Sequence, residues 1–335
     1  MRPLFCCRAL LMGLCEEMGK MNVRCGVDLG GTTAKCGLFT PEGEIMEKWE
    51  LPTQTQEGGS HILSNLAQSL YEHLREKGLA WSDVLGVGMG VPGAVMHESF
   101  VAPCVNLNQW GGFDVAERLS ALCGDVPVKI VNDANAAALG ELSHGGGLGC
   151  DNVLFVTLGT GVGGGVIVNG KLVAGPHGAG GEIGHVKVTN DKGRACGCGK
   201  SGCLEQYASA TGAVRSALEL LKSINVPSSM RPFGDQLTCK DIFDCARAGD
   251  APALRVVEEM GELLGKTLAS VACVCDPEVI VVGGGVARAG DLLLKHVRSG
   301  FRANAFPAQE ETPIVPARLG NDAGMYGAAH LMRGK

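Results

Sequence analysis

One pattern of strand, glycine-rich turn and strand occurs twice in the sequence. The first copy, VDLGGTTAKCGLFTPEGE, begins at Val27, and the second, VTLGTGVGGGVIVNGKL, begins at Val156. In both copies an apolar run leads into glycines and threonines, and a second apolar run and a hydrophilic turn follow. Two unrelated hairpins would not need glycine and threonine at so many turn positions. The repeat therefore predicts two related domains that face a shared cleft.

Strand and helix patterns alternate along the rest of the 335 residues, enough chain for two medium-sized domains. Short apolar runs bounded by glycine, proline or asparagine predict strands, and longer amphipathic runs predict helices. This alternation is typical of the α/β class. The predicted strands include 84–90 and 128–132, and the predicted helices are 59–77, 133–142, 204–223, 251–275 and 323–332.

Three glycine-rich turns at predicted strand ends are candidates for nucleotide binding. Backbone N–H groups in such turns can cradle phosphate oxygens, and threonine hydroxyls add donors. The third turn precedes a helix, so its glycines would let a base or ribose pack against the backbone. The candidate residues are Gly30, Gly31, Thr32 and Thr33 in the first turn, Gly159, Thr160 and Gly161 in the second, and Gly284 and Gly285 in the third.

Asp133 lies in a polar cluster, Asn132-Asp133-Ala134-Asn135, between an apolar strand and an alanine-rich helix. Two interpretations stay open. Asp is a preferred helix N-cap, a role that contributes about 1 kcal/mol. A cap does not account for three polar side chains at one strand end, which is where ligands bind in α/β sheets. A carboxylate there could accept the proton of a substrate hydroxyl while its oxygen attacks a γ-phosphoryl group.

The spacing Cys196-x-Cys198-x4-Cys203, with His185 upstream, supplies three sulfurs and one nitrogen in a glycine-rich loop. This tetrahedral set suits zinc. Four protein ligands close the coordination sphere, whereas a catalytic zinc keeps a position open for water. The pattern therefore predicts a structural zinc site. Taken alone, His185 would more often be a buried histidine with satisfied hydrogen bonds, but the neighbouring cysteines favour a ligand.

Two glutamates flank the predicted metal loop. Glu182 lies three residues before His185, and Glu205 lies two residues after Cys203. A metal that fixes the loop would also fix these carboxylates, which are good acceptors for the hydroxyls of a polyol. A metal-bound imidazole keeps its second nitrogen for a substrate hydrogen bond. We therefore expect a sugar pocket here, although two solvated surface glutamates are also compatible with the spacing.

The composition excludes several classes of protein. Five of the 15 cysteines lie in apolar strand-like or helix-like segments: Cys25, Cys36, Cys123, Cys273 and Cys275. A free cysteine in such a segment behaves as a small buried hydrophobe. We therefore expect a reducing compartment, the cytoplasm. The net charge is −6 and basic residues form no long run, which argues against a nucleic-acid partner. Glycine and charge interrupt the apolar runs, so no membrane partner is expected.

Residues 1–21 contain a short apolar stretch that could pass for a signal-peptide core. Arg8 interrupts it, Glu16 and Glu17 follow it, and no small-residue cleavage site is clear. We expect a disordered or weakly helical extension, with the working protein beginning near Met21.

These motifs resemble the ROK family (repressor, open reading frame, kinase) and, within it, bacterial-type glucokinases. The likeness runs from about Arg24 to Arg333. DLGGTT resembles the first phosphate motif, LGTGVGGGVIVNGKLVAGPHGAGGEIGH the family signature, CGCGKSGCLEQYASATG the zinc loop and VIVVGGGVA the adenosine motif.

The resemblance implies a two-domain actin- and hexokinase-like fold of the duplicated ribonuclease H-like type, with ATP in the interdomain cleft. Residues 22–132 plus 322–335 would form the smaller domain and residues 133–321 the larger one, and the C-terminal helix would return to pack on the smaller domain. The implied reaction is ATP-dependent phosphorylation of glucose at its 6-hydroxyl, with a homodimer or homotetramer as the expected assembly. Asp133 would be the general base, Asp28 would lie near Mg²⁺ and the phosphates, and the sugar would contact Asn106, Asn132, Asp133, Glu182, His185 and Glu205.

Two departures from the family pattern leave the preferred sugar open. Many relatives have lysine in the first turn where this chain has Thr33, and Lys35 follows two residues later. The sugar loop, NLNQW, is one residue longer before Trp110 than expected. Fructose, mannose, N-acetylmannosamine or N-acetylglucosamine could replace glucose. A non-catalytic sugar-sensing regulator is a further alternative, but the residues before the first strand do not form a helix-turn-helix pattern, and Asp133 occupies the base position.

Overall fold

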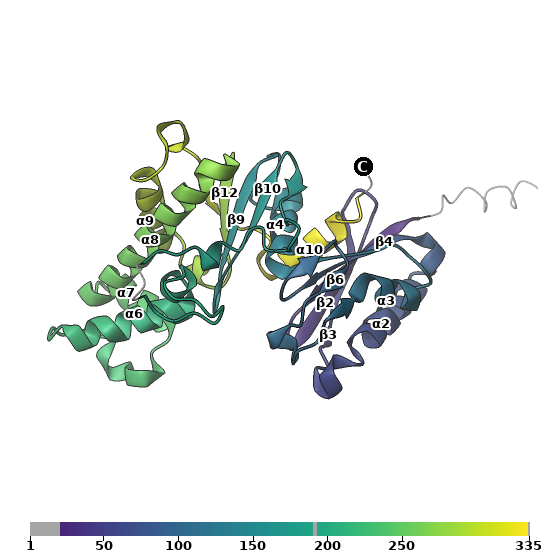
Figure 1. The fold of residues 1–335 in the computed structure, drawn as a ribbon, viewed down its shortest axis with the longest axis horizontal. Coiled ribbons are helices and arrows are strands. Elements are labelled where there is room, and N and C mark those ends of the chain that lie inside the picture. Colours follow the sequence, from purple (N-terminus) through teal and green to yellow (C-terminus); the bar gives the residue numbers. More distant parts are fainter. Residues whose placement is uncertain (1–20, 190–192, 334–335) are drawn as a thin grey trace, which may run out of the picture.

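The computed structural model describes residues 21–189 and 193–333, and the predicted extension falls outside them except for Met21. Two five-stranded sheets share one topology (Figure 1). In each, three antiparallel strands of a meander are followed by two parallel strands, so the repeat seen in the sequence extends to whole sheets. The first sheet has the order β3 (Ile45–Pro52), β2 (Thr33–Phe39), β1 (Val23–Leu29), β4 (Val84–Val91), β8 (Val128–Asn132), and the second β11 (Lys171–Leu172), β10 (Val162–Val168), β9 (Val153–Leu158), β12 (Val279–Gly283), β13 (Ile314–Pro316).

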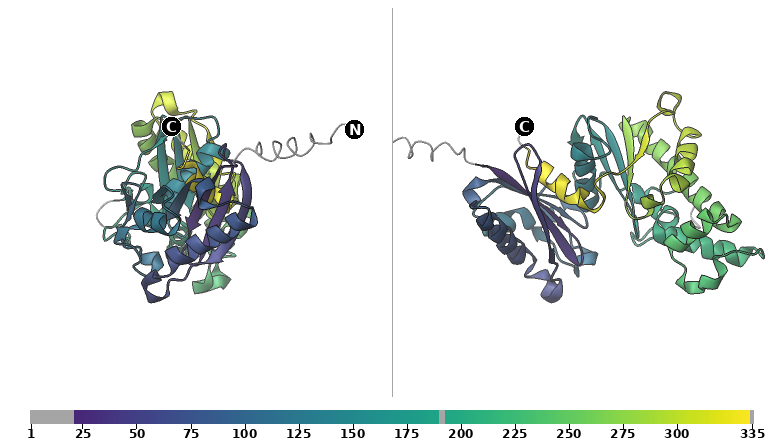
Figure 2. Two further views of the ribbon diagram at one scale, coloured as in Figure 1. Left: turned by 90° about the vertical axis from the view of Figure 1, so that its right-hand side faces the viewer. Right: turned by 180° about the vertical axis from the view of Figure 1, so that it is seen from behind.

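Helices cover both sheets, and two of them lie between the sheets (Figures 1 and 2). The first core joins the first sheet to α2 (Ile62–Glu76) and α3 (Val115–Leu122). The largest core joins the second sheet to α5 (Glu205–Ala208), α6 (Ala210–Ser223), α7 (Cys239–Arg247), α8 (Ala251–Cys275) and α9 (Asp291–Arg302). A small third sheet holds β5 (Val95–Met96), β6 (Phe100–Val101) and β7 (Phe113–Asp114).

Helices α4 (Asp133–His144) and α10 (Ala323–His330) pack against each other between the sheets. Helix α4 packs on β9 and β10, whereas α10 packs on β1 and β4, so the C-terminal helix returns to the first sheet as predicted. Glycines allow these close contacts. A Cβ atom at Gly88 would overlap the carbonyl oxygen of Ala328, and one at Gly327 would overlap that of Ala136. The division into domains at residues 132/133 and 321/322 stays a prediction.

Local capping explains where the predicted helix limits were right or wrong. The helix predicted over 251–275 is confirmed by α8. It begins after Asp250, whose side chain accepts a hydrogen bond from the N–H of Ala253. The single helix predicted over 204–223 is wrong. It is divided at Ser209, whose extended backbone interrupts the helix and whose Oγ accepts from the N–H of Gly212 to begin α6.

Candidate active site

A cleft of about 710 Å³ opens between the sheets, at the N-terminal ends of α4 and α10. The carboxyl ends of β1, β8 and β9 reach its wall, the usual place for a ligand site in an α/β protein. The structure brings together most of the residues predicted from sequence. Those that line the cleft are Asp28, Gly30, Gly31, Asn106, Asn132, Asp133, Gly159, Gly161, Glu182, His185 and Glu205.

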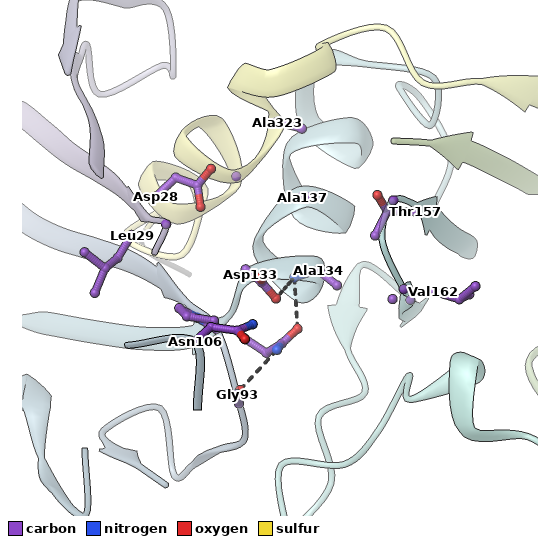
Figure 3. Close-up of a pocket in the computed structure, with 18 of the residues that line it drawn as sticks. Asp28, Leu29, Gly93, Asn106, Asp133, Ala134, Ala137, Thr157, Val162 and Ala323 are labelled. Atoms are coloured by element: carbon purple, nitrogen blue, oxygen red, sulfur yellow. Dashed lines mark hydrogen bonds between the residues drawn. The ribbon is translucent and has the colours of Figure 1, made fainter. Parts of the chain in front are cut away.

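Asp133 is the first residue of α4, and its carboxylate faces the cleft (Figure 3). The N-cap is Asn132, whose Oδ1 accepts from the N–H groups of Ala134 at 2.9 Å and Asn135 at 3.3 Å. Asp133 is therefore not needed as the cap, although its Oδ1 also accepts from the N–H of Ala134 at 2.8 Å. The side chain of Asn132 also hydrogen-bonds the carboxylate, which keeps one side open to the cleft.

Asp133 is exposed to the cleft, and protein atoms surround its carboxylate on the other sides. Burial by the surrounding protein raises its pKa above the usual value, the N–H of Ala134 opposes the rise, and the charge of Glu182 adds to it. A carboxyl group with a raised pKa is a stronger proton acceptor once it is ionised. The environment therefore suits a general base.

Asp28 is the last residue but one of the largely buried strand β1 and lies near Asp133, because Gly90 is close to both residues. Gly324 at the start of α10 leaves the space that the Asp28 carboxylate occupies. Burial raises the pKa of Asp28 to about 6, the charge of Asp133 adds to the rise, and Lys35 opposes it. Two neighbouring carboxylates in a cleft form a site that favours a cation between them.

The raised pKa of Asp28 predicts a pH-dependent cost to stability. Asp28 is protonated in both folded and unfolded chains below its ordinary pKa of 3.8, so it has no effect there. Between pH 3.8 and about 6 the unfolded chain ionises while the folded chain stays protonated, so the folded state is penalised progressively, and the full penalty is present above about pH 6. Asp28→Asn is therefore expected to raise the free energy of unfolding at pH 7 by about 1–3 kcal/mol and to leave it unchanged near pH 3. Urea unfolding at both pH values measures this, and equal stability at pH 7 would contradict it.

Glu205 is held by the second glycine turn. Its Oε2 accepts from the N–H of Val162 at 3.1 Å, and Gly161 leaves the space for it, since a Cβ atom there would overlap Oε2. The absence of a side chain at Gly161 therefore makes room for the carboxylate of Glu205, in addition to any phosphate contact. Glu182 ends the glycine-rich segment before the short turn Ile183–His185 and also lines the cleft.

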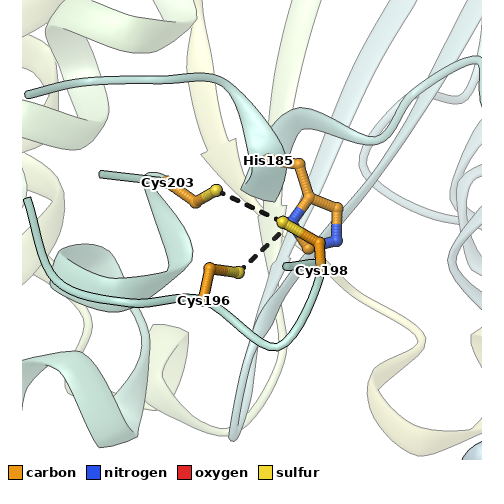
Figure 4. A group of neighbouring side chains, drawn as sticks. All are labelled: His185, Cys196, Cys198 and Cys203. Atoms are coloured by element: carbon orange, nitrogen blue, oxygen red, sulfur yellow. Dashed lines mark hydrogen bonds between the residues drawn. The ribbon is translucent and has the colours of Figure 1, made fainter. Parts of the chain in front are cut away.

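Four side chains form a cluster beside the cleft, His185, Cys196, Cys198 and Cys203 (Figure 4). Their ligand atoms all lie within 4.8 Å of one another. The Sγ atoms of Cys198 and Cys203 are 3.7 Å apart, and Cys196 Sγ is 3.7 Å from His185 Nδ1. Ligands at tetrahedral zinc distances would be separated by about 3.6–3.8 Å. The donor set and its spacing therefore fit zinc.

The ring of His185 connects this cluster with the cleft. Nδ1 faces the sulfur of Cys196, whereas Nε2 lies 3.8 Å from a carboxylate oxygen of Glu182. Cys196 also approaches Oε1 of Glu205, with 3.9 Å between the atoms. Both predicted sugar-binding glutamates thus adjoin the cysteine cluster.

The loop NLNQW around Asn106, which was predicted to bind the sugar, has an uncommon backbone conformation. Asn108 and Gln109 both have positive φ, at 54° and 64°. Trp110 remains buried, and its ring packs edge to face on Phe113 with centroids 5.5 Å apart. Asn106 lines the cleft.

Several predicted nucleotide residues do not line the cleft, namely Thr32, Thr33, Thr160, Gly284 and Gly285. Thr33 begins β2, and the carbonyl group of Thr32 accepts from the N–H of Thr53. Gly284 has φ of 85° and lies against the backbone of Leu158, where a side chain would not fit. Lys35, Thr157 and Asn321 line the cleft and were not predicted as site residues.

Comparison with known protein families matches residues 24–335 to the ROK family. The chain belongs to the ROK family. Among its ROK family relatives, a protein named glucokinase from Halalkalibacterium halodurans is 43% identical over 312 residues, covering 92% of this chain and 94% of the relative. A protein named N-acetylmannosamine kinase from Escherichia coli is 32% identical over 316 residues, covering 92% and 98%.

A solved ROK family structure has the same architecture. The crystal structure of a ROK family glucokinase from Streptomyces griseus in complex with glucose and AMPPNP matches with a TM-score of 0.73 and 34% identity, covering 92% of this chain and 99% of that one. The predicted actin- and hexokinase-like fold is thereby confirmed. Within the described part of the chain, no helix combines the length and apolar character that a membrane span requires.

Proposed function

We propose that this protein transfers the γ-phosphoryl group of ATP to the 6-hydroxyl of glucose. The observation that carries the proposal is the carboxylate of Asp133, which faces the cleft while Asn132 caps the helix. The relatives named glucokinase, one of them solved with glucose and AMPPNP, support the same substrates.

Asp133 acts as general base. It accepts the proton of the 6-hydroxyl as that oxygen forms a bond to the γ-phosphorus, and the bond between this phosphorus and the β,γ-bridging oxygen breaks. ADP leaves with the bonding electron pair. Closure of the cleft would exclude water from the γ-phosphate, since water is a competing acceptor.

The sugar hydroxyls would be held by polar side chains around Asp133. Glu182 and Glu205 accept hydrogen bonds from the hydroxyls, His185 contributes Nε2, and Asn106 offers an amide. Asn132 has little capacity left, because its Oδ1 caps α4 and its Nδ2 donates to the carbonyl oxygen of Gly93 at 3.1 Å. Its side chain also hydrogen-bonds the carboxylate of Asp133, so a sugar contact from Asn132 would have to share these groups.

The nucleotide would lie along the glycine turns, with its phosphates near Asp28. Gly30, Gly31, Gly159 and Gly161 offer backbone groups at the cleft wall, which supports phosphate binding there. Mg²⁺ would be held on the Asp28 side and would neutralise phosphate charge. The threonines of the turns and Gly284 and Gly285 remain predicted contacts of the nucleotide.

The cluster of His185, Cys196, Cys198 and Cys203 would hold a structural zinc ion. With all four positions taken by protein, the metal supplies no reactive water and serves to fix the loop. The sugar would then be recognised by the chain's own residues, because the loop orients the imidazole of His185 and the carboxylate of Glu205.

Gly161→Ala is expected to weaken the sugar site. The added methyl group would displace the carboxylate of Glu205 from the N–H of Val162. We expect the KM for glucose to rise about tenfold, with a change in the KM for ATP of less than about threefold. Steady-state kinetics with each substrate varied in turn measures both, and a larger effect on ATP would assign Gly161 to the phosphates instead.

The preferred sugar is tested by ADP release across hexoses and N-acetylhexosamines. We expect the highest kcat/KM with glucose. The similarity to an N-acetylmannosamine kinase favours that sugar as the second candidate. Activity confined to N-acetylhexosamines would replace the proposed substrate while keeping the mechanism, and no activity with any sugar would favour a sensing role. The homodimeric or homotetrameric assembly and the cytoplasmic location stay predictions.

A further inference from the structure

The cleft is strongly acidic. Among its lining residues, all within the described ranges, the carboxylates are Asp28, Asp133, Glu182 and Glu205, whereas Lys35 is the one lysine or arginine. A nucleoside triphosphate adds further negative charge to this environment. Backbone N–H groups and a divalent cation offset part of it, and a permanently charged side chain is the strongest additional partner that the protein can offer.

Lys35 is positioned at the phosphate side of this cleft. It lies directly opposite Asp28 in the β1–β2 pair, so both side chains leave the sheet on the same face. Gly37 marks this face as the one that packs on α10, because a Cβ atom there would meet Met325. The ammonium group of Lys35 donates a hydrogen bond of 2.8 Å to the carbonyl oxygen of Asn321, another residue of the cleft wall.

We propose that Lys35 binds the triphosphate and stabilises the negative charge on the γ-phosphoryl group during transfer. An ammonium group has three N–H donors, and the bond to Asn321 uses one of them, so two are left for phosphate oxygens. The inference rests on the proposed use of ATP, although not on the identity of the sugar.

The competing explanation is that Lys35 only tethers the turn Gly320–Asp322 that leads into α10. The chain contains a matched control for this. Lys48 on the neighbouring strand β3 contacts Asp322 of the same turn, with 2.7 Å between Nζ and Oδ2, but it does not line the cleft. A lost tether should therefore affect both lysine variants, whereas a lost phosphate contact should affect Lys35 alone.

The test measures binding of MgATP, MgADP and adenosine to the whole protein by calorimetry, without sugar, for Lys35→Met, Lys35→Arg and Lys48→Met. For Lys35→Met we expect MgATP and MgADP to bind at least about tenfold more weakly and adenosine to bind within about twofold of the unaltered protein. In glucose turnover, kcat/KM for ATP is expected to fall about 100-fold. Lys35→Arg should recover part of both losses because it keeps the charge.

Three results would overturn the inference. These are unchanged MgATP binding in Lys35→Met, equal losses in Lys35→Met and Lys48→Met, and an equal loss of adenosine and MgATP. Failure of the proposed reaction is distinguishable, because an unaltered protein that binds MgATP but phosphorylates no sugar leaves the Lys35 binding comparison intact.

Discussion

Asp133→Asn is expected to lower kcat for glucose phosphorylation about 10³-fold, with the KM for glucose changed by less than about fivefold. Asparagine has nearly the same shape and can still accept from the N–H of Ala134, but it cannot take the hydroxyl proton. The coupled ADP-release assay gives both constants. A variant with near-normal turnover would show that another group accepts the proton.

The neighbouring residue provides a control for folding. Because Asn132 caps α4, Asp133→Asn should not lower the free energy of unfolding, and removal of a carboxylate whose pKa is raised by burial favours the folded state. Asn132→Ala should instead cost about 1 kcal/mol of stability by removing the cap. Urea unfolding of the two variants separates the roles. If Asp133→Asn were the less stable of the two variants, Asp133 rather than Asn132 would be the residue whose side chain stabilises the start of α4.

Cys203→Ser is expected to abolish zinc binding and to raise the KM for glucose about 10- to 100-fold, with the KM for ATP within about threefold. Cys203 is buried, and its loop leads directly into Glu205, so a loosened loop releases a sugar ligand. The predicted phosphate contacts Asp28, Gly30 and Gly31 lie in or directly after β1 of the other sheet, so we expect them to be less affected. Metal content by mass spectrometry and kinetics with each substrate measure these effects.

An exposed cysteine outside the cluster is the matched control. The prediction that Cys273 is buried is wrong, because the residue is exposed on α8. Cys273→Ser should keep the zinc content and both KM values. Zinc-free unaltered protein with an unchanged KM for glucose would contradict a structural role for the metal. Equal losses of glucose and ATP binding in Cys203→Ser would point to general unfolding rather than a local effect.

The sequence predicted the features that depend on local spacing. The duplicated hairpins, the cysteine cluster and the acidic residues of the cleft all have short-range patterns that the structure brings together. Asp133 could be placed at a strand end, but the structure was needed to identify Asn132 as the cap, because both residues are good caps by type, and the role of Asp133 as base stays a prediction.

Contacts between distant segments could not be read in the same way. Asn321 reaches the cleft because α10 crosses back to the first sheet, and nothing in its neighbourhood distinguishes it. Lys35 had a usable signal, since alternation along the hairpin puts it opposite Asp28. Gly284 was predicted as a nucleotide contact, whereas its immediate constraint is the backbone of Leu158.

The return of α10 to β1 and β4 has a consequence for synthesis on the ribosome. The first sheet is translated early, yet the helix that covers its glycine-lined face comes from residues 323–330. The first sheet therefore stays incompletely covered until translation is nearly finished. A nascent chain stalled before residue 323 would expose apolar surface on that sheet and would be a natural target for chaperones.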